Sequence, residues 1–216
     1  MDIIYQVRSN DTTVAVGHHQ GYEIDPQKLM SEREKEILHQ LSPRKQSEWL
    51  ASRELLYRIA DLPERAECVY DDFGKPYLEG INKHISISHS SSWCAAMISD
   101  RSCGIDIQVY SDTVERIEKK FLSPGEIDQT DQLENRLHHL HILWGAKESM
   151  YKAYGKKKLE FRQHIFVRSI DVTGCKGIGE IRFEDIHLLY ELHFRILPEA
   201  ALVYCIQHSA DASLNG

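Results

Sequence analysis

Two stretches that lie far apart in the sequence share a strand, turn, strand pattern, and this repetition constrains the fold more than any other feature. In the first stretch, the alternating residues 85–88 and the apolar residues 93–98 flank a serine-rich turn. In the second, residues 195–197 and 200–206 flank a Pro-Glu turn. The pattern predicts two β-hairpins and hints at two related halves, although hairpins are common and do not establish such a relationship alone.

Composition and charge exclude several classes of protein. The 216 residues can form one large domain or two small ones, and no apolar run approaches the roughly 18 residues that cross a bilayer. Residues 1–7 lack the basic and apolar segments of a secretory signal, so we expect a cytoplasmic protein that does not bind membranes. The net charge of -7 argues against nucleic-acid binding.

Helix signals are clearest in three regions. Ser31 and Glu34 fit a capping box, and Ser42 followed by proline fits the start of a second helix. Further helices are expected at residues 113–121 and 133–154, with strands between the helical regions. We therefore expect an α+β fold.

The expected domain boundary lies near residues 100–103. It divides the chain into an N-terminal half, residues 1–102, and a C-terminal half, residues 103–208. Residues 209–216 are small and polar, and we expect them to form a flexible tail.

The strand expected at residues 104–109 places its apolar side chains on one face and Asp106 and Gln108 on the other. We expect the apolar face to pack and the other face to be available for chemistry. A single aspartate on a strand more often faces solvent. Together with Glu148, however, Asp106 would supply two hard oxygen ligands of the kind that Mg²⁺ prefers.

Trp144, Glu148 and Lys152 are spaced four residues apart and fall on one stripe of the long helix. The simplest interpretation of Glu148 and Lys152 is a surface ion pair that contributes roughly 0.2–0.5 kcal/mol. Trp144 on the same stripe suggests instead a cleft or core, and Lys147 and Lys156 add positive charge where a phosphate could sit.

Three other places could contact a phosphate group. Residues 86–90, which include Ser88 and His89, place hydroxyl groups and an imidazole at a strand end, and Lys75 lies in a Gly-Lys-Pro turn. Arg53 could grip a phosphate or simply face solvent. Each feature alone is weak, and the absence of a GxSxG elbow excludes the common Ser/His hydrolases.

These motifs occur in the order typical of the Sfp-type, or surfactin-synthetase-activating, 4'-phosphopantetheinyl transferases, which the chain resembles. The matching segments cover roughly residues 70–160, with Arg53 as an outlying member. They are Phe73 to Pro76, Ile85 to Ser90, Gly104 to Ile107, Phe121 to Glu126 and Trp144 to Lys152. Their conjunction is more specific than any one of them.

The resemblance implies two similar α+β halves with the active site in the cleft between them, in a protein that we expect to be a monomer. It implies transfer of the 4'-phosphopantetheine arm of coenzyme A to a serine of an apo acyl or peptidyl carrier protein, with release of adenosine 3',5'-bisphosphate. Such carriers serve fatty-acid, polyketide or nonribosomal-peptide synthesis. Because this is phosphoryl transfer, catalysis should depend on positioning and charge stabilisation.

By the same resemblance, Asp106 and Glu148 are the expected Mg²⁺ ligands, and Glu148 is also the expected general base. Lys152 would neutralise or protonate the leaving phosphate, which makes Asp106, Glu148 and Lys152 the expected catalytic residues. The family often has glutamate where this chain has Gln108. Gln108 is therefore a further candidate ligand that carries no charge.

The coenzyme A contacts implied by the resemblance are Arg53, Lys75, Ser88 and His89, in addition to Lys152. Arg53 would meet the 3'-phosphate. A lysine-rich surface at Lys119, Lys120 and residues 156–158 could receive an acidic carrier, although a lysine run is more often a solvated face.

Two other functions remain as alternatives. A catalytically silent module that binds coenzyme A or a carrier protein is supported only by Gln108. A magnesium-dependent nucleotide hydrolase is disfavoured because the sequence lacks a GxxxxGK[ST] loop.

Overall fold

The computed structural model describes residues 1–20, 25, 30–62, 66–130, 135–156 and 158–208. The expected flexible tail, residues 209–216, lies outside them. Internal contacts divide the chain into two compact units, Met1–Asp100 and Arg101–Gly216, and each is described by itself. Each unit combines an antiparallel sheet with helices, which confirms the predicted α+β class.

The first unit contains a six-stranded antiparallel sheet with the order β1-β2-β6-β5-β4-β3. Its strands are β1 (Asp2–Arg8), β2 (Thr12–His18), β3 (Cys68–Tyr70), β4 (Pro76–Leu78), β5 (His84–Ser90) and β6 (Trp93–Ser99). Strands β5 and β6 form the hairpin predicted from the alternating pattern, and Ser91 in its turn has a positive φ of 56°.

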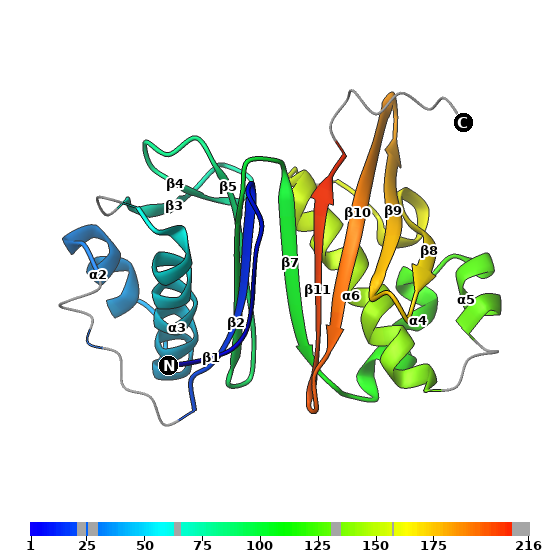
Figure 1. Cartoon of the computed structure of the whole chain (residues 1–216), viewed down its shortest axis with the longest axis horizontal. Coiled ribbons are helices and arrows are strands. Elements are labelled where there is room, and N and C mark those ends of the chain that lie inside the picture. The colour runs from blue at the N-terminus through cyan, green and yellow to red at the C-terminus, as the bar shows by residue number, and fades with distance from the viewer. Residues whose placement is uncertain (21–24, 26–29, 63–65, 131–134, 157, 209–216) are drawn as a thin grey trace. The chain divides into compact units, whose positions relative to one another are not determined.

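Among the described residues, the helices α2 (Glu32–His39) and α3 (Pro43–Ala60) accompany this sheet. The predicted capping box is present, because Ser31 Oγ accepts from Glu34 N at 3.2 Å and the Glu34 carboxylate accepts from Ser31 N at 3.0 Å. Ser42 is the N-cap of α3, as expected, but its side chain makes no capping hydrogen bond. Helix α3 packs on strands β2, β5 and β6 (Figure 1).

The second unit contains a five-stranded antiparallel sheet with the order β7-β11-β10-β9-β8. Its strands are β7 (Cys103–Val109), β8 (Ile165–Asp171), β9 (Lys176–Phe183), β10 (Ile186–Ile196) and β11 (Ala200–Gln207). Strands β10 and β11 form the second predicted hairpin. Strands β7 and β8 are the two edges of the sheet.

The part of the second unit that the structure describes forms the helices α4 (Thr113–Phe121), α5 (Pro124–Thr130), α6 (Arg136–Tyr154) and α7 (Phe161–His164). Helix α4 has the predicted bounds. Helix α6 ends as predicted at Gly155, whose φ of 68° suits a glycine C-cap. Helices α5 and α7 were not predicted.

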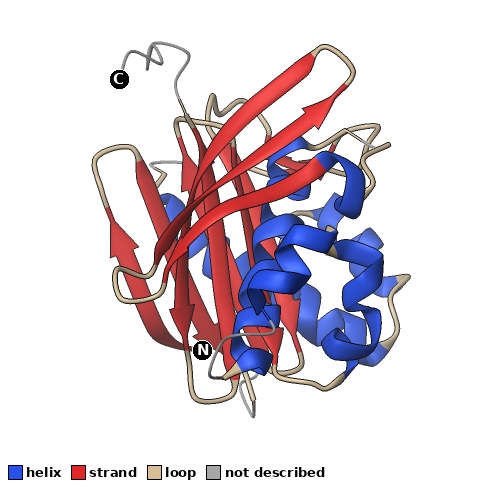
Figure 2. Cartoon of the chain, turned by 90° about the vertical axis from the view of Figure 1, so that its right-hand side faces the viewer, coloured by secondary structure: helices blue, strands red, loops and turns tan. Residues whose placement is uncertain are grey.

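Helix α6 is the centre of this unit, because it packs along strands β7 and β11 and also contacts β8, β9 and β10. Figure 2 shows the helices of the unit gathered beside its strands. The helix buries residues around most of its circumference, which is why it carries no simple apolar stripe. Its buried apolar side chains include Leu140, Ile142, Ala146, Met150 and Ala153.

Across the described residues, no helix is both long and apolar enough to cross a membrane.

Candidate active site

Asp106 lies on β7, and its side chain faces α6 rather than solvent. Only 6% of the residue is exposed. Its neighbour on the same strand face, Gly104, lies against the backbone of α6 at Ser149 and Ala153. The opposite face of the strand is buried as well, since Ile105 and Ile107 have no exposed surface. The solvent-facing position considered for Asp106 is therefore excluded, and the availability of this face for chemistry stays a prediction.

Lys152, in the last turn of α6, is the cation that pairs with this buried carboxylate. Its Nζ donates to Asp106 Oδ1 at 2.8 Å and to the backbone oxygen of Ile105 at 2.9 Å. The Asp106 side chain is 8% exposed and that of Lys152 is 29% exposed, so the pair is partly shielded from water. Lys152 therefore joins α6 to β7, and does not form only the exposed ion pair with Glu148 within the helix that the sequence alone would suggest.

Glu148 is the second carboxylate of the group. Its pKa is raised to about 7, first by burial and second by the nearby Asp106 carboxylate, while Lys152 opposes the rise. Glu148 is therefore partly protonated near neutral pH. A carboxyl group in that state can either accept a proton or bind a cation.

The chemistry of these residues fits a magnesium ion. Two carboxylates interact in a poorly hydrated place where a divalent cation would relieve their repulsion. Gly145 of α6 lies close to Asp106, since a Cβ built on Gly145 would be 3.8 Å from Asp106 Oδ2. Gln108 is half-buried and lies two residues beyond Asp106 on the same strand face.

The described residues hold no cluster of three or more His, Cys, Asp or Glu placed to bind a metal. A magnesium site here would therefore depend on Asp106 and Glu148, together with water and the oxygens of a bound ligand.

The Lys147 side chain is buried, whereas we expected it to be available to a bound phosphate. Its side chain has no exposed surface, and its Nζ lies 2.8 Å from Glu126 Oε2. The expectation that Lys147 adds positive charge beside a bound phosphate is therefore wrong, because its charge is buried and paired with Glu126. Its neighbour Trp144 packs on the rings of Phe121 and Phe161, with centroid distances of 5.0 and 5.6 Å.

Arg53 lies on α3 in the first unit and is 1% exposed. Its guanidinium stacks 3.5 Å from the centre of the Trp49 ring, and its Nη2 donates to Tyr70 Oη at 2.8 Å. A stacked, buried arginine of this kind holds a fixed orientation. The solvated face considered for Arg53 is excluded, and its role toward a 3'-phosphate stays a prediction.

Lys75 lies in the predicted turn, which joins β3 to β4. Gly74 takes a φ of 86°, a value that favours glycine. The Asp71 carboxylate holds the turn by accepting from the backbone N–H groups of Phe73 and Lys75 at 2.9 and 2.8 Å. The Lys75 side chain also acts on His84, whose pKa is lowered by burial first and by the lysine charge second.

Ser88 and His89 are neighbours on β5, where Ser88 is 7% exposed and the His89 side chain is 48% exposed. His89 Nδ1 lies 3.5 Å from Glu48 Oε2. Glu48 also borders a polar hollow of about 470 Å³ in the first unit. The hollow is lined by His19, Gln20, Arg44, Ser47, Glu48, Ser91 and Ser92.

The structure thus brings Asp106, Glu148 and Lys152 together within the second unit. The other predicted contacts, Arg53, Lys75, Ser88 and His89, belong to three elements of the first unit. Sequence analysis missed the role of Glu126. The available signal was its position directly after Ser-Pro-Gly, which is where a helix begins.

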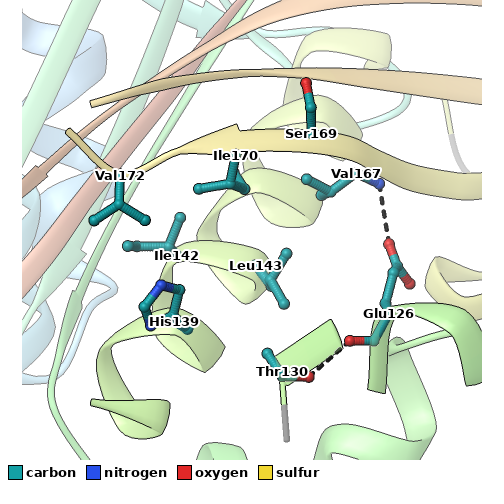
Figure 3. Close-up of a pocket in the computed structure, with 9 residues that line it drawn as sticks. All are labelled: Glu126, Thr130, His139, Ile142, Leu143, Val167, Ser169, Ile170 and Val172. Atoms are coloured by element: carbon teal, nitrogen blue, oxygen red, sulfur yellow. Dashed lines mark hydrogen bonds between the residues drawn. The ribbon is translucent and has the colours of Figure 1, made fainter. Parts of the chain in front are cut away.

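A separate cavity of about 230 Å³ lies between α5, α6 and β8 (Figure 3). Aliphatic side chains dominate its walls, with polar groups from Glu126, Thr130, His139 and Ser169. None of the three residues Asp106, Glu148 and Lys152 lines it. Asp106 belongs to β7, at the opposite edge of the sheet from β8.

Comparison with known proteins finds similarity over the second unit. Among solved structures, the chain is similar to holo-[acyl-carrier-protein] synthase from Neisseria meningitidis, with 18% identity, a TM-score of 0.38, and coverage of 50% of this chain and 98% of that one. No curated protein matches the chain. Residues 102–205, which include Asp106, Glu148 and Lys152, match the model of the 4'-phosphopantetheinyl transferase superfamily.

Proposed function

We propose that this protein is a magnesium-dependent 4'-phosphopantetheinyl transferase of the Sfp type. It would transfer the 4'-phosphopantetheine arm of coenzyme A to a serine of an apo acyl or peptidyl carrier protein. The observation that carries the proposal is the partly buried group of Asp106, Glu148 and Lys152 within the segment that matches the superfamily model.

In the proposed reaction, the serine Oγ attacks the phosphorus atom next to the pantetheine arm. A bond forms between Oγ and phosphorus, and the bond between phosphorus and the bridging pyrophosphate oxygen breaks. Adenosine 3',5'-bisphosphate leaves with the electron pair. Glu148 accepts the serine proton, a role that its pKa of about 7 suits.

Lys152 supplies positive charge, and its hydrogen bonds to Asp106 and to the Ile105 backbone fix the position of its Nζ. We assign it to the leaving phosphate. Magnesium, when bound by Asp106 and Glu148, would offset the charge of the pyrophosphate. Gln108 would approach the ion as a neutral ligand or through water.

We assign the coenzyme A contacts to Arg53, Lys75, Ser88 and His89, with Arg53 for the 3'-phosphate. For the carrier, we propose a basic surface at the exposed Lys119, Lys120, Lys156 and Lys158. Carrier proteins of this class are acidic, so a local basic surface would attract them despite the net charge of -7.

Mass spectrometry tests the proposal directly. The protein is incubated with coenzyme A, Mg²⁺ and a panel of apo carriers from fatty-acid, polyketide and nonribosomal-peptide synthesis. A modified carrier gains about 340 Da, the mass of the transferred group. Failure to modify every carrier, while a known transferase modifies them, would refute the proposed activity. The panel also identifies the pathway.

The silent binding module is the second candidate, because Gln108 stands where the family often has a charged ligand. Calorimetry of coenzyme A binding distinguishes the enzyme from the silent module. The enzyme should bind coenzyme A more tightly in the presence of Mg²⁺, whereas binding to a silent module should not respond to the metal. Glu148→Gln should abolish transfer and leave coenzyme A binding measurable.

A further inference from the structure

Lys147 and Glu126 form a buried ion pair one residue away from Glu148 in the helix. The Lys147 side chain is 0% exposed and that of Glu126 is 7% exposed. Besides Glu126, Lys147 Nζ donates to the backbone oxygens of Phe161 at 3.2 Å and Ile165 at 2.7 Å. An ammonium group has three donors, and here each has an acceptor.

Both oxygens of the Glu126 carboxylate also accept hydrogen bonds from backbone N–H groups. Its Oε1 accepts from the backbone N–H of Val167 at 3.0 Å (Figure 3), and its Oε2 accepts from the backbone N–H of Ser123 at 2.8 Å. The ion pair therefore links α6 to α5, to the first residue of α7 and to the edge strand β8.

The other side of α6 is fixed by a different contact. Gly104 of β7 lies so close to the helix that a Cβ there would be 1.9 Å from Ser149 O and 2.8 Å from Ala153 N. Successive helix residues point about 100° apart. Lys147 is thus held toward β8, Ser149 lies against β7, and Glu148 projects from the turn that these two contacts hold.

We propose that Lys147 is a positioning residue of the active site, which sets the rotation of α6 and thereby aims the Glu148 carboxylate at the proposed metal site beside Asp106. This inference rests on the proposed function. Lys147 itself contacts neither substrate nor metal.

The physical reason lies in the two anchors of the helix. Loss of Lys147 removes the polar contacts that hold this turn of α6 toward α5, α7 and β8. Apolar packing and the close approach at Gly104 remain, and they fix the rotation of the turn less exactly than directional hydrogen bonds. A displacement of about 1 Å at a reacting group can lower a rate about 100-fold, even when the substitution is remote from the chemistry.

The test must separate positioning from loss of folding. Lys147→Met alone leaves the Glu126 carboxylate buried without its cation, which is strongly destabilising. The double variant Lys147→Met/Glu126→Gln removes both charges and should recover most of that stability. Lys176→Met, an exposed lysine on β9, is the matched control.

Each variant is compared with the wild type by thermal unfolding, by calorimetry of coenzyme A with and without Mg²⁺, and by kcat and KM for an apo carrier. We expect the folded double variant to lose most of the Mg²⁺ effect on coenzyme A affinity. Its kcat should fall about 10- to 100-fold, while its carrier KM stays within about threefold because docking is unchanged.

A double variant that folds and keeps the wild-type kcat and Mg²⁺ effect would show that the pair is structural only. If the double variant does not fold, Glu126→Gln alone is measured, and the same two outcomes apply. A wild type that transfers nothing but binds coenzyme A in a Mg²⁺-dependent way would refute the proposed activity and still allow the positioning test. A wild type without any Mg²⁺ effect would overturn both.

Discussion

A Cβ built on Gly104 would lie 1.9 Å from the backbone oxygen of Ser149, a separation that real atoms do not reach. Strand β7 therefore approaches helix α6 more closely here than any residue with a side chain permits. The approach places Asp106, two residues further along the strand, against the same helix. The absence of a side chain at Gly104 therefore allows the Asp106 carboxylate to be buried against α6.

Replacing Gly104 by alanine should separate β7 from α6. The neighbouring atoms are backbone and cannot move aside, so we expect the free energy of unfolding to fall by about 3 kcal/mol, at the upper end for overpacking. Urea titration measures the change. Gly125→Ala is the control, because a Cβ there meets nothing within 4 Å. Equal stability of Gly104→Ala and wild type would contradict the close approach.

The strand face that carries Asp106 and the helix stripe that carries Glu148 could be predicted, because strand and helix periodicity depend on nearby residues alone. That the two residues act together was implied by ligand chemistry and by the resemblance to the Sfp-type transferases. The burial of the Asp106 face could not be predicted. It depends on α6 packing against Gly104, whose contact at Ser149 is distant in sequence. The alternation of β7 shows which residues share a face but not what covers that face.

The burial of Lys147 likewise depends on a residue that is distant in the sequence. Its helical position is clear from the sequence, yet its partner Glu126 lies in α5, a helix of seven residues that begins Pro-Gly. Ser-Pro can begin a helix, but a Pro-Gly pair more often indicates a turn, so no helix is predicted there. The lysine consequently looked available for a phosphate.

The raised pKa of Glu148 makes stability depend on pH. Its ordinary pKa of 4.5 rises to about 7 in the folded protein, so the folded state holds the proton more tightly. The stabilising effect is complete below pH 4.5 and is lost as the pH rises through 7. Relative to Glu148→Gln, the wild type should lose up to about 3 kcal/mol across this range.

Urea titrations of both proteins at several pH values, in the absence of Mg²⁺, test this expectation. Titrating groups that do not interact with Glu148 cancel in the difference between the two proteins. Stability curves that stay parallel from pH 5 to pH 9 would show that Glu148 titrates normally.

The ion pair between Asp106 and Lys152 should couple more strongly than an exposed one. A double-mutant cycle with Asp106→Asn and Lys152→Met should give a coupling energy of about 1–3 kcal/mol, because the Asp106 carboxylate is shielded from water. The matched control is Lys83 with Asp100, whose side chains are 39% and 51% exposed. Exposed pairs contribute up to about 1 kcal/mol, so equal coupling in both cycles would contradict the shielding.

Gln108→Glu tests how the proposed metal site is built. Gln108 follows Asp106 on the same face of β7 and is half-buried, so a carboxylate there would add a third negative charge to the site. Magnesium affinity increases with the charge of its ligands, and we expect half-saturation of transfer at about tenfold lower Mg²⁺. Without metal, the variant should be less stable than the wild type, since the added charge repels Asp106 and Glu148.

Gln6→Glu, on the exposed strand β1, is the control. It adds the same charge in the other unit and should change neither the Mg²⁺ requirement nor the stability. A folded Gln108→Glu protein with the wild-type Mg²⁺ requirement would place residue 108 outside the metal site and leave Asp106 and Glu148 as its protein ligands.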